Sequence, residues 1–156
     1  MMPIKVKFNE AAFREYLDKA KEDAIINVIE AIDRAFKAAV IHAKNIPPDI
    51  GFSDQTGNLR SSIGYVLYQD GKEINSFFSG AAEGVKTGMS LADRIAQSQA
   101  GEGVIIGVLV AGMNYAVFVE AKGRDVLTSA SFKLLPEFKK NIAIVGEAYG
   151  LKIKLL

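Results

Sequence analysis

Few side chains of this sequence have the types and spacing that enzyme chemistry needs. His42 is the only histidine among 156 residues and cysteine is absent, which excludes thiolate zinc sites, cysteine nucleophiles and most histidine-based triads. On a helix, His42 would lie with Ala39 and Val40 near an apolar border, which favours a packed or surface histidine over a catalytic one. We therefore expect no catalytic, cofactor-binding or metal-binding residue, and no enzyme.

Two glycine-rich segments have the composition of phosphate-binding loops without the spacing. In residues 80–87 three residues separate the first two glycines and Val85 stands before Lys86, whereas a P-loop has four residues there and lysine directly after the glycine. Residues 101–107 are one residue too long for a dinucleotide-binding fingerprint, and they enter a predicted strand instead of a helix. Neither segment predicts a nucleotide site.

Charged side chains are numerous but spread along the chain. The net charge is +1 and Lys139-Lys140 is the only basic doublet, so we expect no sequence-specific nucleic-acid partner. The carboxylates expected as helix caps or loop-surface groups are Glu83, Asp93, Glu102, Glu120 and Asp125. No spacing places two of them on one face of a predicted pocket, although counting alone leaves a paired-acid hydrolase open.

Composition predicts one domain made in the cytoplasm. Hydrophobic residues are 49% and charged residues 24% of the chain, as in an ordinary globular protein. No apolar run approaches the roughly 20 residues that a membrane span needs, and the first residues, MMPIKVKFNE, lack the apolar stretch of a signal peptide. We expect no membrane partner.

Two long helices are the main elements that would position any functional residues of the chain. Apolar side chains recur at steps of three and four over residues 10–45, which predicts a helix roughly 50 Å long. A domain of this size is only roughly 26 to 30 Å wide, so we expect part of the helix to project and meet another chain. A second helix is predicted from Asp125 to Gly150, with Pro136 either dividing it or kinking it near Leu134.

Four runs rich in β-branched or aromatic residues predict two hairpins. Residues 64–69 and 72–78 flank Asp70-Gly71, a strong short-range hairpin signal. Residues 104–110 and 115–120 flank a second turn that contains glycine and asparagine. The chain is therefore expected to be α+β, with the long N-terminal helix and the C-terminal helix packed on one face of an antiparallel sheet of about four strands.

The segments outside these elements also carry predictions. Residues 79–103 form a glycine-rich insert that we expect to be mobile, with one helix over residues 90–99. Residues 4–8 and 151–156 both alternate apolar residues with lysine. Each end could pair as an edge strand with the other end or with a neighbouring subunit, and a disordered tail is an equal alternative.

Two short motifs, residues 56–63 (TGNLRSSI) and residues 114–120 (NYAVFVE), stand about fifty residues apart between the two long helices. In this order they resemble the tail-component family of long-tailed bacteriophages and prophages, whose members are head-tail joining, neck or tail-completion proteins. The motif positions are Thr56, Gly57, Leu59, Arg60, Ser62, Ile63, Tyr115, Ala116, Val119 and Glu120.

The resemblance implies a structural role in the virion and no catalytic group. Copies of the protein would form a ring, expected to be a hexamer, at the neck or the top of the tail tube. The implied partners are other copies of itself and phage connector and tail proteins. The implied location is the tail or neck of the virion, after synthesis in the bacterial cytoplasm.

The sequence departs from the common family pattern after Glu120. Many relatives continue with Gly-Thr and a proline-containing stretch, whereas residues 121–127 lead almost directly into the predicted helix. The alternatives from other classes are a small enzyme or a nucleic-acid-binding domain with the same α+β layout. A toxin–antitoxin or chaperone-type interaction module is a third.

Overall fold

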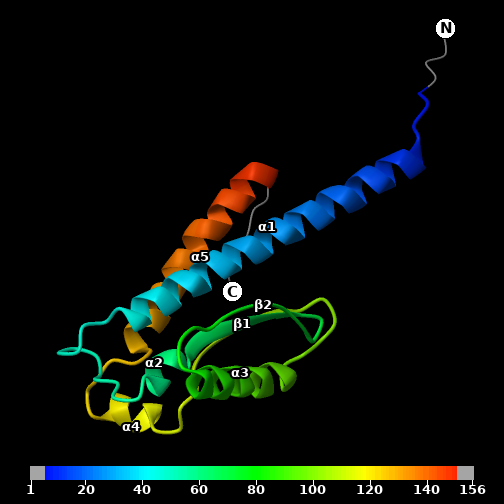
Figure 1. Cartoon of the computed structure of the whole chain (residues 1–156). Coiled ribbons are helices and arrows are strands. Elements are labelled where there is room, and N and C mark those ends of the chain that lie inside the picture. Colours follow the sequence, from blue (N-terminus) through cyan, green and yellow to red (C-terminus); the bar gives the residue numbers. More distant parts are fainter. Residues whose placement is uncertain (1–5, 151–156) are drawn as a thin grey trace, which may run out of the picture.

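Helices and strands both occur in residues 6–150, the part of the chain that this computed structural model describes. In order they are α1 (Glu10–Lys44), α2 (Asn58–Ser61), β1 (Ile63–Gln69), β2 (Lys72–Phe77), α3 (Ala82–Gln97), β3 (Ile105–Ala111), α4 (Ala116–Ala121) and α5 (Thr128–Tyr149). Figure 1 shows α1 as the longest element, with α5 beside it and the sheet and α3 below. The α+β class, the long N-terminal helix and the C-terminal helix are confirmed.

The sheet has three antiparallel strands in the order β2-β1-β3 within the described residues. The β1–β2 hairpin is confirmed: Asp70 and Gly71 have φ angles of 52° and 76°, the left-handed pair that a tight two-residue turn needs. Strand β1 is buried along almost its whole length, because its alternate side chains face different helices. Tyr65 and Leu67 pack with α1, whereas Val66 and Tyr68 pack with α3.

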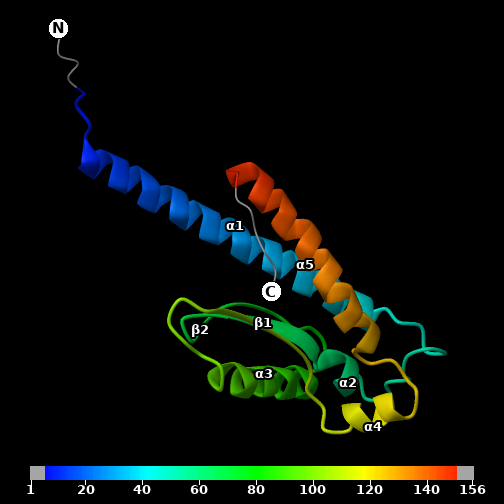
Figure 2. The same ribbon diagram turned by 180° about the vertical axis from the view of Figure 1, so that it is seen from behind.

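The prediction that the sheet carries its helices on one face was therefore wrong for α3. Helices α1 and α3 cover opposite faces, as the two views in Figures 1 and 2 show. Helix α5 packs along α1, where Ile142 and Val145 cluster with Ala31. A strand as continuously apolar as β1 must be covered on both faces. The apolar run in its sequence therefore indicated that helices lie on both sides of the sheet.

The predicted fourth strand at residues 115–120 was also wrong, because this segment forms helix α4. After β3 the chain is held against the start of β1: the Gly112 amide donates to the Ser62 carbonyl oxygen at 3.1 Å and the Met113 amide to Ser62 Oγ at 3.2 Å. The next turn is helical, with the Val119 amide donating to the Tyr115 carbonyl at 3.1 Å. A six-residue apolar run cannot be assigned to strand or helix by periodicity alone.

Helix α3 begins at Ala82, not at Ser90 as predicted. Its two buried glycines allow close packing: a Cβ at Gly84 would lie 2.3 Å from the Asn58 carbonyl oxygen, and one at Gly88 would lie 2.5 Å from the Ser62 carbonyl oxygen. These glycines serve helix packing, whereas the sequence suggested a loop. The expected mobility of residues 79–103 stays a prediction.

The predicted ends of the long helices are close to the observed ones. Helix α1 spans Glu10–Lys44, and Asn9 caps its start through Oδ1, which accepts a hydrogen bond from the Ala12 amide at 3.1 Å. Helix α5 starts at Thr128, runs through Pro136 as one helix, and ends at Gly150, which has a left-handed φ of 63°. A division into two helices at Pro136 is therefore wrong.

The predicted terminal strands fall largely outside the described residues. Residues 6–8 form no strand, and the remainder of the pattern at residues 4–8 and all of residues 151–156 lie beyond the described range.

Candidate functional site

The two motifs that carry the family resemblance meet in space. Ser62, in the first motif, accepts the hydrogen bonds from the amides of Gly112 and Met113, which lead into the second motif. The buried side chains of Leu59, Ile63 and Ala116 belong to one hydrophobic cluster. Tyr115 and Val119 pack against the same cluster. The structure therefore brings together two segments about fifty residues apart.

Residues of the first motif close the end of α1. The Arg60 side chain donates through Nη1 to the Lys44 carbonyl oxygen, and its backbone amide donates to Asp54 Oδ2 at 2.6 Å. The Arg60 guanidinium carbon also lies 5.2 Å from the centre of the Phe52 ring, a distance suited to a cation–π contact. Burial, with the nearby charge of Arg60, lowers the pKa of Lys44. Arg60 thus caps the C-terminal end of α1.

The turn before α2 fixes the remaining first-motif residues. Gly57 has a φ of 76°, a left-handed angle that glycine adopts without strain. Thr56 Oγ1 accepts a hydrogen bond from the Asn58 amide at 3.2 Å. Ser62 Oγ donates to the Leu59 carbonyl at 2.8 Å while it accepts from Met113. The hydroxyl groups of Thr56 and Ser62 thus hold the backbone around this turn.

Glu120, the last motif residue, caps the first turn of α5. Its Oε1 accepts hydrogen bonds from the amides of Thr128 at 2.8 Å and Leu127 at 3.4 Å, and from the Thr128 hydroxyl. Asp125 Oδ1 accepts from the Ser129 amide at 3.2 Å. The expectation that both carboxylates are caps is confirmed. A negative charge at a helix N-terminus is also favoured by the helix dipole.

A histidine and a serine, residue types that can act as a general base and a nucleophile, lie in contact, and the sequence did not predict this contact. His42 Nε2 lies 2.9 Å from Ser129 Oγ, and both residues line a cavity of about 270 Å³ with Asp125. A serine nucleophile needs its histidine oriented by a third group and amide donors free for the oxyanion. Here Asp125 binds the Ser129 amide instead of the imidazole, and Glu120 occupies the Thr128 amide.

The His42–Ser129 pair therefore joins the end of α1 to the start of α5. The two residues are 87 positions apart, and nothing in the local sequence of either one signals the other. The expectation of a packed histidine fits this position, since His42 is half-buried.

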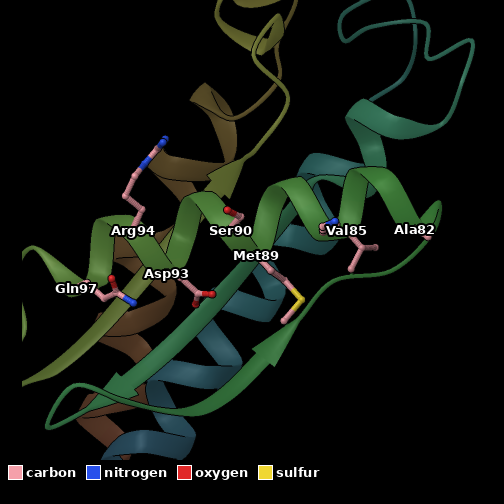
Figure 3. A pocket seen from close by; sticks show the side chains of 8 residues that line it. Ala82, Val85, Met89, Ser90, Asp93, Arg94 and Gln97 are labelled. Carbon is pink, nitrogen blue, oxygen red and sulfur yellow. The ribbon is translucent and has the colours of Figure 1, made fainter.

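A hollow of about 700 Å³ lies along the flank of α3 (Figure 3). Met89 and Asp93 point from the helix toward the strands, whereas Arg94 points away from them (Figure 3). The Asp93 carboxylate already accepts the hydrogen bond from the Tyr68 hydroxyl. All the lining residues belong to α3, so no second element brings a chemical group to this hollow.

A polar network ties α1 to the sheet. Asp33 Oδ1 accepts hydrogen bonds from the Tyr65 hydroxyl at 2.5 Å and from Asn75 Nδ2 at 2.6 Å. Burial, followed by this hydrogen bond and the charge of Asp33, raises the pKa of Tyr65 above its usual value. The network holds α1, β1 and β2 together.

The first part of α1 carries an apolar stripe that residues 6–150 leave largely exposed. We call residues 10–23 of this helix the arm; all of them are exposed except Ala20, which is half-buried. Phe13, Tyr16 and Leu17 share one face of the arm and are 46%, 69% and 48% exposed. At 1.5 Å per residue the arm is about 21 Å long, and Figures 1 and 2 show it extending past α5. The predicted projection of α1 is confirmed.

An apolar cleft opens between α1, α5 and the edge strand β3. It has a volume of about 270 Å³. Its lining residues are Ile32, Phe36, Gly107, Ser131, Leu134, Leu135 and Phe138. The rim continues along α5, where Leu135 and Phe132 are 53% and 76% exposed. The arm and this cleft are the two apolar surfaces that motif reasoning did not find.

Two other classes of site are absent from residues 6–150. No cluster of three or more histidine, cysteine or acidic side chains is placed to hold a metal ion there. In the same range no helix combines the length and the apolar character that crossing a bilayer requires.

Comparisons with known proteins gave no match to a family model, to a curated protein or to a solved structure. The resemblance to the phage tail-component family therefore rests on the two motifs alone and stays a prediction.

Proposed function

We propose that this protein is a structural virion protein of a bacteriophage or prophage. It would form part of the head-tail connector or the tail terminus by assembling with other copies into a ring, expected to be a hexamer. Its further partners would be phage connector and tail proteins, and its location the tail or neck of the virion.

The observation that carries an assembly role is the arm. Three large apolar side chains on one helix face, Phe13, Tyr16 and Leu17, are exposed, whereas Tyr149 at the end of α5 contacts α1 at Asn27. Exposed apolar patches of this kind mark surfaces that bind other proteins. A ring subunit needs such contact surfaces, one meeting a different one on the next copy, and it needs no catalytic group.

The motifs support the phage assignment in a different way. Their residues fix the α2 turn, the α4 segment and the caps of α1 and α5. A family that shares these residues would share the scaffold, while the exposed surfaces adapt to particular neighbours. The order of the two motifs between long helices is what links this chain to tail components.

The test is to find the protein in particles. The flanking genes in the source DNA should encode portal, capsid, terminase or tail-tube proteins. After induction of the prophage, mass spectrometry of purified particles should detect the protein, and gold-labelled antibodies should mark the neck or the tail end. Metabolic or regulatory neighbours, together with absence from purified particles, would overturn the proposal.

A small hydrolase is the alternative that one contact favours, namely His42 Nε2 beside Ser129 Oγ at 2.9 Å. Esterase assays on the purified protein and its Ser129→Ala variant decide this alternative. Turnover that disappears in the variant would support an enzyme. Equal background rates in both proteins would remove the alternative.

A further inference from the structure

We propose that the arm of one copy docks into the cleft of a second copy of this chain. The arm would place Phe13, Tyr16 and Leu17 against Leu134, Leu135 and Phe138. This contact rests on the proposed ring assembly, for which it supplies the interface.

The arm cannot reach the cleft of its own chain. Ile32 and Phe36, which line the cleft, belong to the same continuous helix as Phe13. Phe13 and Ile32 are 19 residues apart, or about 28 Å along the helix axis. Helix α5 extends along α1 only as far as Asn27, whose Nδ2 donates to the Tyr149 hydroxyl at 2.8 Å. Only another copy can bring the two apolar surfaces together.

The two surfaces match in chemistry. The arm presents two aromatic rings and a leucine on one helix face, flanked by charged side chains. Six of the seven residues lining the cleft are apolar or glycine. This is the pattern of a helix bound in an apolar groove, with anchors at steps of three and four.

The two helix segments that carry these surfaces also have opposite net charge. The arm, residues 10–23, has five acidic and three basic side chains, a net charge of −2. The first part of α5, residues 128–140, has three lysines and one glutamate, a net charge of +2. The three lysines, at positions 133, 139 and 140, are exposed. Opposite charges at an interface steer association and oppose an arm–arm pairing, in which both partners are acidic.

The geometry makes the contact directional. Each copy has one arm, on the first half of α1, and one cleft, which the second half of α1 lines together with α5 and β3. An arm in a neighbour's cleft is a heterologous contact, which closes into a ring when the rotation between copies allows it. The cleft of every copy is thus incomplete without the arm of the next.

The experiment uses the full chain and three variants. The arm variant carries Tyr16→Ala and Leu17→Ala, and the cleft variant carries Leu135→Asp. The control variant carries Asp18→Ala, on the arm face that turns away from the stripe. All altered side chains are largely exposed, so each variant should keep the far-UV circular dichroism and thermal transition of the parent. Sedimentation velocity across concentrations measures self-association.

We expect the arm and cleft variants each to weaken self-association by at least about tenfold, since hot-spot truncations cost more than about 1.4 kcal/mol. The control should stay within about twofold of the parent. An equimolar mixture of the two variants should form a 1:1 heterodimer and nothing larger, because it contains only one intact arm facing one intact cleft.

The possible failures are distinguishable. A parent chain that assembles while both variants still assemble would overturn the docking contact and leave ring assembly standing. A cleft variant that dimerises alone would show an arm–arm contact instead, which also overturns the proposal. A parent chain that stays monomeric at all concentrations would overturn both the docking contact and self-assembly.

Discussion

The substitution Gly88→Ala tests whether the glycines of α3 serve close packing. In a helix exposed to solvent this change should stabilise the protein by about 1 kcal/mol, because alanine has the higher helix propensity. At this site the new Cβ would lie 2.5 Å from the Ser62 carbonyl oxygen. That oxygen cannot move freely, since it accepts the Gly112 amide at 3.1 Å.

The size of the effect follows from these two opposing contributions. Overpacking against a fixed backbone atom costs roughly 3 kcal/mol at the upper end of its range. After subtraction of the helix-propensity gain, we expect a net loss of about 2 kcal/mol in the free energy of unfolding. For a chain of this length the loss corresponds to a melting temperature about 4 to 8 °C lower.

Urea and thermal unfolding of the Gly88→Ala variant measure this loss. Ser90→Ala in the same helix is the matched control, because Ser90 is exposed and its replacement should be neutral or slightly stabilising. The urea m-value should stay unchanged in both variants. A Gly88→Ala protein that melts at a higher temperature than the parent would refute the packing argument.

Three further predictions concern groups that hold α5 and the sheet. Glu120→Ala should lower the free energy of unfolding by about 1 kcal/mol, because it removes the cap of α5. Glu120→Gln should lower it less, because the amide oxygen of glutamine still accepts a hydrogen bond from Thr128. Equal losses for the two variants in urea unfolding would contradict this prediction. Ser129→Ala should lower the free energy of unfolding by about 1 kcal/mol, because it removes the hydrogen bond to His42. An unchanged urea midpoint would show that this contact between α1 and α5 does not stabilise the fold. The folded-state pKa of Tyr65 is raised, so its stabilising contribution is complete below about pH 10, the unfolded-state pKa, and is lost as pH rises above it. Tyr65→Phe should therefore reduce the loss of stability measured above pH 10, and an identical pH profile would oppose this assignment.

The sequence predicted those elements whose signals are local. The period of α1 and the Asp70-Gly71 turn are complete within a few neighbouring residues, so both predictions were correct. The length of α1 also predicted its projection, because the rest of the chain is too narrow to cover a helix of 35 residues.

Elements decided by distant contacts were not predictable. Helix α4 forms where Ser62, about fifty positions earlier, holds the chain that enters it. In the sequence, Gly84 and Gly88 are typical of a loop. Their role in helix packing follows only from the backbone of Asn58 and Ser62, which lies against them. The contact between His42 and Ser129 depends on how α1 and α5 align, which no single segment encodes.

The motif residues show a related limit. Their types and spacing suggested a family, and the structure gives each of them a place in a turn, a cap or the core. Their roles in folding therefore explain the pattern without identifying an exposed functional surface. The cleft became visible only once the packing of α5 along α1 was known.

The most direct test of the central claim is the stoichiometry of the purified full-length chain, measured by native mass spectrometry and by class averages from negative-stain electron microscopy. The account predicts closed rings of one copy number, expected to be six, which the arm variant fails to form. Monomers at every concentration, or open filaments without closed rings, would contradict it.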